Sequence, residues 1–141
     1  MVKCLDQLKK ITGNALDESQ VRMMNPLVLA YIGDTIYDLL VRTYLILNNR
    51  VSVHNLHNQA VNFVKAGAQA HTLEEIFEKL TDEEKIIVRR GRNAKSGTVP
   101  KNADIGEYRY ATGFEALLGY LYLTEQVDRL MEIGQWIFEE K

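Results

Sequence analysis

Cysteine and proline are almost absent from this chain of 141 residues. The single cysteine, Cys4, excludes an internal disulfide and any zinc site built from several cysteines. The only prolines are Pro26 and Pro100, and no linker rich in glycine, serine and proline divides the chain. Length and composition fit one globular domain, which would bury roughly 68–70% of the surface that its unfolded chain exposes.

Long hydrophobic runs are also missing. The most apolar segment, residues 36–47, is interrupted by Asp38 and Arg42 and is too short to span a bilayer. The first residues contain no apolar run that could act as a signal peptide. We therefore expect a cytoplasmic protein that has no contact with membranes.

A net charge of −2 does not indicate a nucleic-acid-binding protein, but the distribution of charge is uneven. Between residues 85 and 101 the charged side chains are all basic: Lys85, Arg89, Arg90, Arg92, Lys95 and Lys101. The acids that balance them lie mainly in residues 74–84 and after residue 124. Such a patch can bind phosphates although the whole chain is acidic. The alternative interpretation is a solvated surface loop, whose densest basic part is residues 89–93.

Helical periodicity dominates the chain, and the pattern predicts an all-α fold. Asn25 followed by Pro26 predicts the start of a long helix that ends near residues 48–49. Its expected inward face consists of Leu29, Ile32, Ile36, Leu39, Leu40, Thr43 and Leu47. Ser52 predicts the cap of a second helix, which runs through residue 68 and either breaks at residues 71–72 or continues to residue 80.

Thr81 and Glu84 form the pattern of a capping box and open a third helix. Loop composition follows in residues 93–102. Helical periodicity returns near Tyr108, continues to Leu123 and is followed by a last amphipathic helix near residues 125–138. The basic segment thus leads into the helix that carries Glu115.

Two acids, Asp34 and Glu115, interrupt the most apolar stretches of their halves of the chain. A carboxylate taken out of water costs several kcal/mol unless it is paired, hydrogen-bonded or bound to a metal. Glycines lie close to both acids, although glycine destabilises a helix interior by ~1 kcal/mol relative to alanine. Their presence there indicates that another backbone or a ligand approaches closely. We expect the two acids to share a Mg²⁺ ion, with Asp38, one helical turn after Asp34, as a weaker candidate ligand. The plainer interpretation is a pair of half-exposed helix acids that face arginines.

At these residues the sequence resembles a known family. The motif Tyr31-Ile32-Gly33-Asp34 resembles the end of the ribonuclease III signature, and residues 114–119, Phe-Glu-Ala-Leu-Leu-Gly, resemble its second motif. Residues 29–34, 90–93 and 108–123 together resemble Mini-ribonuclease III, a group that has the catalytic domain without a double-stranded-RNA-binding domain. The resemblance covers the chain from about Pro26 to its end. It implies one ribonuclease III-like domain over residues 1–141, with residues 1–24 as an N-terminal extension and residues 25–141 as the catalytic core.

The resemblance implies a Mg²⁺-dependent, homodimeric endoribonuclease that cleaves double-stranded RNA and matures the precursor of the large-subunit (23S) ribosomal RNA. Asp34 and Glu115 would be the catalytic residues and metal ligands. Ala30 and Thr112 occupy positions that are acidic in the full-length family. The number of metal ions in the site, one or two, is therefore undecided. The side chains that would grip the duplex are Arg89, Arg90, Arg92, Asn93, Lys95, Lys101 and Arg109.

Two other functions remain open at this stage. Ala30 and Thr112 favour a catalytically silent module that binds duplex RNA or assists ribosome assembly. A helical interaction protein with no role in RNA metabolism is the third interpretation.

Overall fold

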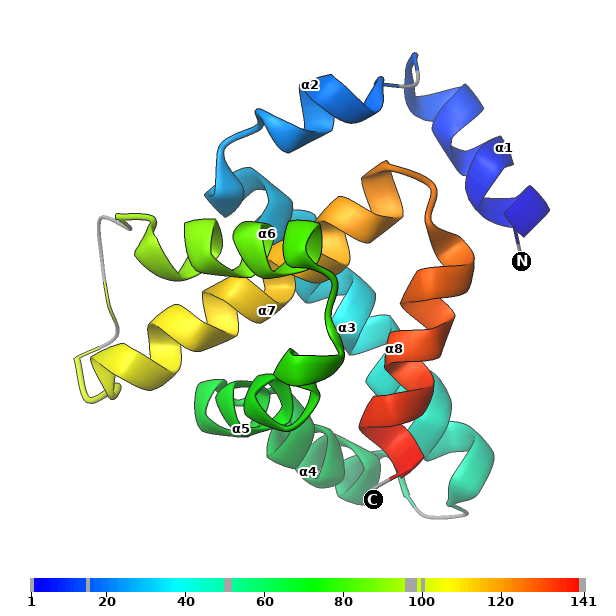
Figure 1. The fold of residues 1–141 in the computed structure, drawn as a ribbon. Helices are drawn as coiled ribbons and strands as arrows, with labels where there is room; N and C mark the ends of the chain where they lie inside the picture. Colours follow the sequence, from blue (N-terminus) through cyan, green and yellow to red (C-terminus); the bar gives the residue numbers. More distant parts are fainter. Residues whose placement is uncertain (1, 15, 50–51, 96–98, 100, 140–141) are drawn as a thin grey trace.

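The structure, a computed structural model, describes residues 2–14, 16–49, 52–95, 99 and 101–139. Its regular elements are all helical across these residues, so the predicted all-α fold is confirmed. Figure 1 shows their arrangement. They are α1 (Val2–Thr12), α2 (Glu18–Arg22), α3 (Pro26–Asn48), α4 (Val53–Val64), α5 (Ala66–Ile76), the 3₁₀ turn η1 (Phe77–Lys79), α6 (Asp82–Asn93), α7 (Ile105–Leu123) and α8 (Val127–Glu139). In this part of the chain, no helix combines the length and the hydropathy of a membrane span.

Helix α7 lies at the centre of the fold. Ten of its residues, all between Ala111 and Tyr122, are buried. Helices α3, α5 and α6 pack along it, and α8 contacts it near its end (Figure 1). A helix that is apolar on nearly every side needs such an enclosed position. Side chains from three different helices can therefore meet around α7.

Glycines allow the backbones of neighbouring helices to come very close. A Cβ atom added to Gly33 of α3 would lie 1.7 Å from the carbonyl oxygen of Glu115 on α7, and one added to Gly119 would lie 1.9 Å from a carbonyl oxygen of α3. In the same way, α6 crosses α7 where a Cβ on Gly91 would lie 2.8 Å from the Cα of Gly113. The glycines near the two acids are thus explained by the approach of another backbone.

Local capping interactions set the helix starts that the sequence predicts. Asn25 caps α3 and Ser52 caps α4, and each side chain accepts a hydrogen bond from a backbone N–H of the first turn. Thr81 and Glu84 form the complete capping box of α6, with distances of 3.1 and 2.9 Å. Because caps depend on residues that are close in sequence, these three starts are confirmed.

Two predictions about helix extent were wrong. The second helix does not run through residue 68, because Lys65 has an extended conformation (ψ 150°) and separates α4 from α5. His71 and Thr72, the proposed breakpoint, lie inside α5. Helix α6 continues to Asn93, so the residues just after Arg90, where the helical pattern of the sequence stops, belong to its last turn rather than to a loop.

The predicted inward face of α3 is also partly wrong. Leu39 is 61% exposed and Leu47 is 78% exposed, and Thr43 is exposed as well. The side that contacts α7 instead buries Leu29, Ala30, Gly33, Ile36, Tyr37, Val41 and Leu45. Since α3 carries apolar residues on almost every side, periodicity could not distinguish the core face from a second apolar face.

Candidate active site

Asp34 and Glu115 come together where α3 crosses α7. The contact between Gly33 and the backbone of Glu115 brings the two carboxyl groups side by side, close enough for Asp34 to raise the pKa of Glu115. Glu115 is mostly buried between the helices, whereas Asp34 is exposed. The expectation that both acids intrude into the apolar core therefore holds only for Glu115. Asp34 lies at the edge of the core, because the neighbouring Gly33 makes the contact with α7.

The environment of Glu115 disfavours its ionised form. Burial raises the pKa of the Glu115 carboxyl, and the adjacent Asp34 raises it further, from an ordinary value of 4.5 to about 8. A cation between the two groups would remove their repulsion and replace the hydration that Glu115 has lost. Asp34 keeps one side of the pair open to solvent and to a ligand.

The carboxylates of Asp34 and Glu115 are suitable ligands for Mg²⁺. No group of three or more His, Cys, Asp and Glu side chains is close enough to hold a metal among the described residues. Mg²⁺ is bound in many enzymes by one or two carboxylates together with waters and substrate phosphates, and Asp34 and Glu115 can supply the two carboxylates.

Asp38 does not join this pair. It lies one turn after Asp34 on α3, but its carboxylate forms an exposed ion pair with Arg42 of the same helix, with 3.2 Å between Oδ2 and Nε. In the described residues it is not part of any three-residue metal cluster. The structure thus gives Asp38 a local partner outside the acid pair.

Sequence reasoning missed Gln69, which reaches the acid pair from α5. Its side chain is only 3% exposed and lies against the carboxyl of Glu115, whose ionised form it favours. The sequence does offer a signal, since Gln69 is the one long polar side chain in the run of small residues 66–70 and lies on the same helix face as the buried Leu73 and Ile76.

The predicted RNA-binding residues fall into separate places. Arg90 points inward and donates hydrogen bonds to the backbone carbonyls of Arg22 and Met24, so that it fastens the connection between α2 and α3 to α6. Arg89 lies over the ring of Phe77 at 5.7 Å, which leaves its charge on the surface.

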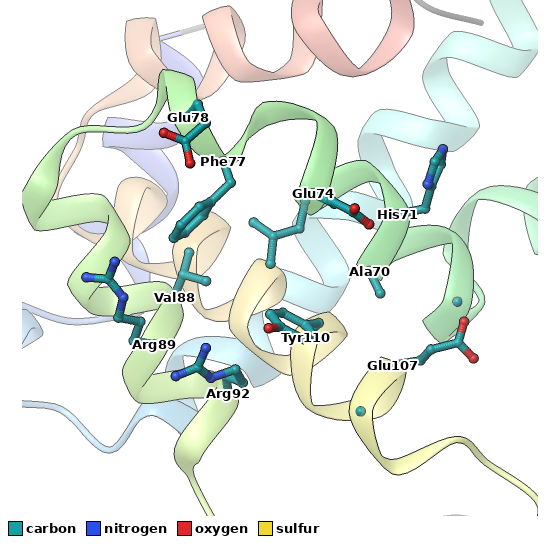
Figure 2. A pocket seen from close by; sticks show the side chains of 13 residues that line it. Ala70, His71, Glu74, Phe77, Glu78, Val88, Arg89, Arg92, Glu107 and Tyr110 are labelled. Atoms are coloured by element: carbon teal, nitrogen blue, oxygen red, sulfur yellow. The ribbon is translucent and has the colours of Figure 1, made fainter.

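Two hollows lie beside these side chains. The larger, about 780 Å³, is bounded by α5, η1, α6 and the start of α7, with the Arg89 and Arg92 side chains along α6 and the Glu74 and Glu107 side chains across from them (Figure 2). Neither Asp34 nor Glu115 lines it.

The smaller hollow has a volume of about 320 Å³. Lys95, Arg109 and Thr112 line it, and Thr112 precedes Glu115 by about one helical turn on α7. Lys101 is exposed in the connection to α7, and the Oδ1 atom of Asn93 accepts a hydrogen bond from Arg92 at 3.2 Å. The basic groups therefore surround the first half of α7 without forming one continuous loop.

Comparison with known proteins agrees with this arrangement. The Ribonuclease III domain matches residues 27–126. A Mini-ribonuclease 3 from Thermoanaerobacter sp. is 48% identical over 128 residues, which cover 89% of this chain and 90% of the relative. A Mini-ribonuclease 3 from Brevibacillus brevis is 50% identical over 116 residues, or 82% of this chain and 87% of the relative.

A solved structure supports the same relationship. The crystal structure of a protein from Fusobacterium nucleatum superposes with a TM-score of 0.76 at 29% identity, and the match covers 85% of this chain and 96% of that protein. The predicted resemblance is thus confirmed by the domain match, by the relatives and by the fold. The chain belongs to the ribonuclease III family and, within it, to the Mini-ribonuclease III group.

Proposed function

We propose that this endoribonuclease of the ribonuclease III type is a cytoplasmic, Mg²⁺-dependent homodimer that cleaves double-stranded RNA in the precursor of 23S ribosomal RNA. The observation that carries the proposal is the direct pairing of Asp34 with Glu115 at the crossing of α3 and α7. A module that only binds RNA has no need of two adjacent carboxyl groups that repel each other when ionised.

In this proposal Asp34 and Glu115 hold the ion through their carboxylates. Bound Mg²⁺ supplies an activated water and stabilises negative charge on the phosphate and the leaving oxygen. Glu115 gives up its proton on binding, and the mostly buried position of its side chain keeps bulk water from one side of the site. Exposed Asp34 leaves the opposite side open to the RNA backbone.

Arg109 and Lys95 are suited to hold the phosphates next to this pair. Arg109 precedes Glu115 by six residues on α7, an axial distance of about 9 Å. A-form RNA is recognised mainly through its shape, phosphates and 2′-hydroxyls, and exposed basic side chains beside Thr112 suit that task. Arg89, Arg92, Asn93 and Lys101 extend the same basic surface, whereas Arg90 serves mainly to fasten the fold in this proposal.

The homodimer is supported by an apolar stripe on the outside of α3. Val28, Tyr31, Leu39 and Ile46 are spaced for one helix face and are 49%, 82%, 61% and 61% exposed. Large apolar patches of this kind are typical of protein interfaces. Since Asp34 follows Tyr31 by about one turn, a second copy on this stripe would lie beside the active site, which suits cleavage of the two strands by the two protomers.

The test is cleavage of end-labelled duplex RNA, including a fragment of the 23S precursor, with Mg²⁺ or with EDTA. We expect Asp34→Asn and Glu115→Gln to lose more than about 100-fold in rate, beyond the ~10–100-fold typical of residues that only support a metal ligand. Asp128→Asn, at an exposed acid on α8, is the matched control and should keep the wild-type rate. Equal cleavage by wild type and Asp34→Asn, or binding without cleavage at every Mg²⁺ concentration, would refute the proposal and favour the silent RNA-binding module.

A further inference from the structure

Gln69 is held rigidly at the corner between α4 and α5. Its Nε2 atom donates a hydrogen bond to the carbonyl oxygen of Val64 at 2.7 Å. Val64 is the last residue of α4, and the extended conformation of Lys65 leaves this carbonyl without a helical N–H partner. The side chain therefore satisfies a backbone group that the helix break exposes, and this bond fixes where the amide lies.

The same amide reaches the acid pair. It lies against the carboxyl of Glu115, on the helix against which α5 packs, and it favours the ionised form of that carboxyl. A primary amide has two N–H donors and one carbonyl acceptor. One donor is used on Val64, which leaves the second N–H for the adjacent Glu115 carboxyl, and Gln69 thus links the end of α4 to the proposed metal ligand.

The acceptor of this amide is buried and unused. Its Oε1 atom has no hydrogen-bond partner among the described residues although the side chain is only 3% exposed. A buried acceptor without a partner costs about 1–3 kcal/mol. A water held beside the Glu115 carboxylate would supply the missing donor, since Gln69 lies against that carboxyl and Oε1 belongs to the same amide group.

We infer that Gln69 is a positioning residue of the active site: its amide turns the Glu115 carboxylate toward Asp34, and its Oε1 atom accepts a hydrogen bond from a water in the coordination shell of the ion. This inference rests on the proposed metal site at Asp34 and Glu115. A purely structural role, in which Gln69 only satisfies the Val64 carbonyl, would affect the stability of the fold but would leave the affinity for the ion unchanged.

The test compares Gln69→Met with Thr72→Val. Methionine keeps the length of the side chain and removes its donors and acceptor. Thr72 is the matched control, because it is equally buried on α5 at 3% exposure and lies one turn from Gln69. The affinity for Mn²⁺ is measured by calorimetry on the RNA-free protein, and the Mg²⁺ concentration that gives half-maximal cleavage is measured in single-turnover reactions.

We expect Gln69→Met to bind Mn²⁺ about 10–100-fold more weakly than wild type, as is usual when a group that orients a metal ligand is removed. The half-maximal Mg²⁺ concentration should rise by a similar factor, while the affinity for duplex RNA stays the same. Thr72→Val should match wild type in both measurements.

The outcomes separate this inference from the proposed function. If wild type binds Mn²⁺ and cleaves RNA but Gln69→Met has the same affinity for Mn²⁺, the role of Gln69 is refuted and the proposed function stands. If wild type neither binds Mn²⁺ nor cleaves RNA, both are refuted. Should Gln69→Met fail to fold, Gln69→Asn provides the same comparison: it keeps the amide but is one methylene shorter, and wild-type affinity for Mn²⁺ in that variant would refute the inference.

Discussion

The Glu115 carboxyl should make the stability of the metal-free protein depend on pH, and Glu115→Gln should remove this dependence. Burial, and then Asp34, raises the pKa of Glu115 in the folded state to about 8 from an ordinary 4.5. At a pH between these two pKa values, the folded chain keeps a proton on Glu115 that the unfolded chain has released. The free energy of unfolding therefore falls as pH rises from about 4.5 to about 8 and is level on either side.

The size of the effect follows from the difference between the two pKa values. Each pKa unit corresponds to ~1.4 kcal/mol, so the shift of Glu115 allows at most about 5 kcal/mol. Solvent reaches part of the carboxyl and hydrates it when it ionises, and we therefore expect about 2–4 kcal/mol. Glutamine has the same shape without the charge. Glu115→Gln should match wild type near pH 5 and exceed its unfolding free energy by about 2–4 kcal/mol at pH 8.5.

The assay is urea unfolding followed by circular dichroism, in EDTA, at a series of pH values from 5 to 8.5. The difference in unfolding free energy between Glu115→Gln and wild type isolates the contribution of Glu115, because the other titrating groups contribute equally to both proteins. Glu84 illustrates this: burial alone would raise its pKa, but Arg129, which donates to both carboxylate oxygens, lowers it. The stabilisation from Glu84 is therefore present above its unfolded pKa and is lost only as pH falls below this range.

Asp34→Asn and added Mg²⁺ provide two further checks. Burial is the largest single cause of the shift in Glu115 and would remain, so Asp34→Asn should recover only part of the stabilisation that Glu115→Gln gives. At pH 8, Mg²⁺ at 100 times its dissociation constant should stabilise wild type by about 2.7 kcal/mol and leave Glu115→Gln unchanged. A difference curve that is flat from pH 5 to 8.5 would refute the reasoning, since it would mean that Glu115 ionises in the folded state as easily as in the unfolded chain.

Four other substitutions test the architecture around the site. Gly33→Ala should destabilise the fold by about 3 kcal/mol or more in urea unfolding, because its Cβ would lie 1.7 Å from the carbonyl oxygen of Glu115; a loss below 1 kcal/mol would contradict so close a crossing. Arg109→Gln should weaken duplex RNA binding and reduce the slope of log affinity against log salt by about 1. Arg90→Gln should instead lower the melting temperature and leave that slope unchanged. The opposite results for the two variants would mean that Arg90 binds RNA and Arg109 holds the fold. Tyr31→Asp should shift sedimentation from dimer to monomer, and an unchanged dimer would place the interface elsewhere.

Sequence reasoning succeeded where the deciding residues are close together in the chain. Asn25, Ser52 and Thr81 each cap a helix through a bond to an amide two or three residues away, so their helix starts can be read directly from the sequence. The break at Lys65 carries no comparable signal. Lys65 makes no side-chain capping bond at the start of α5.

The difference between local and long-range partners also explains which features of the site could be predicted. The prediction that Asp34 and Glu115 meet is confirmed, because glycines near both acids indicated a close helix crossing. The exposure of Asp34 was not predicted, since α3 is apolar on two faces and only the packing of α7 decides which of them is covered. The inward position of Arg90 could not be predicted, because its partners lie far along the chain. Gln69 was missed although its place as the one long polar side chain in residues 66–70 was a signal.

The features that weaken these helices locally are the ones that build the site. Glycine destabilises a helix interior by about 1 kcal/mol, and a mostly buried carboxyl beside another acid costs more. Gly33 and Gly119 nevertheless allow α3 and α7 to touch at the level of the backbone, which places Asp34 and Glu115 on rigid, buried helices rather than on loops. Rigid elements hold ligating groups more accurately than loops do. The ten buried residues of α7 supply the packing energy that keeps this crossing closed against the repulsion of the two acids. The stability lost at Glu115 is therefore a direct consequence of a geometry in which two carboxylates are fixed in place before the ion and the RNA arrive.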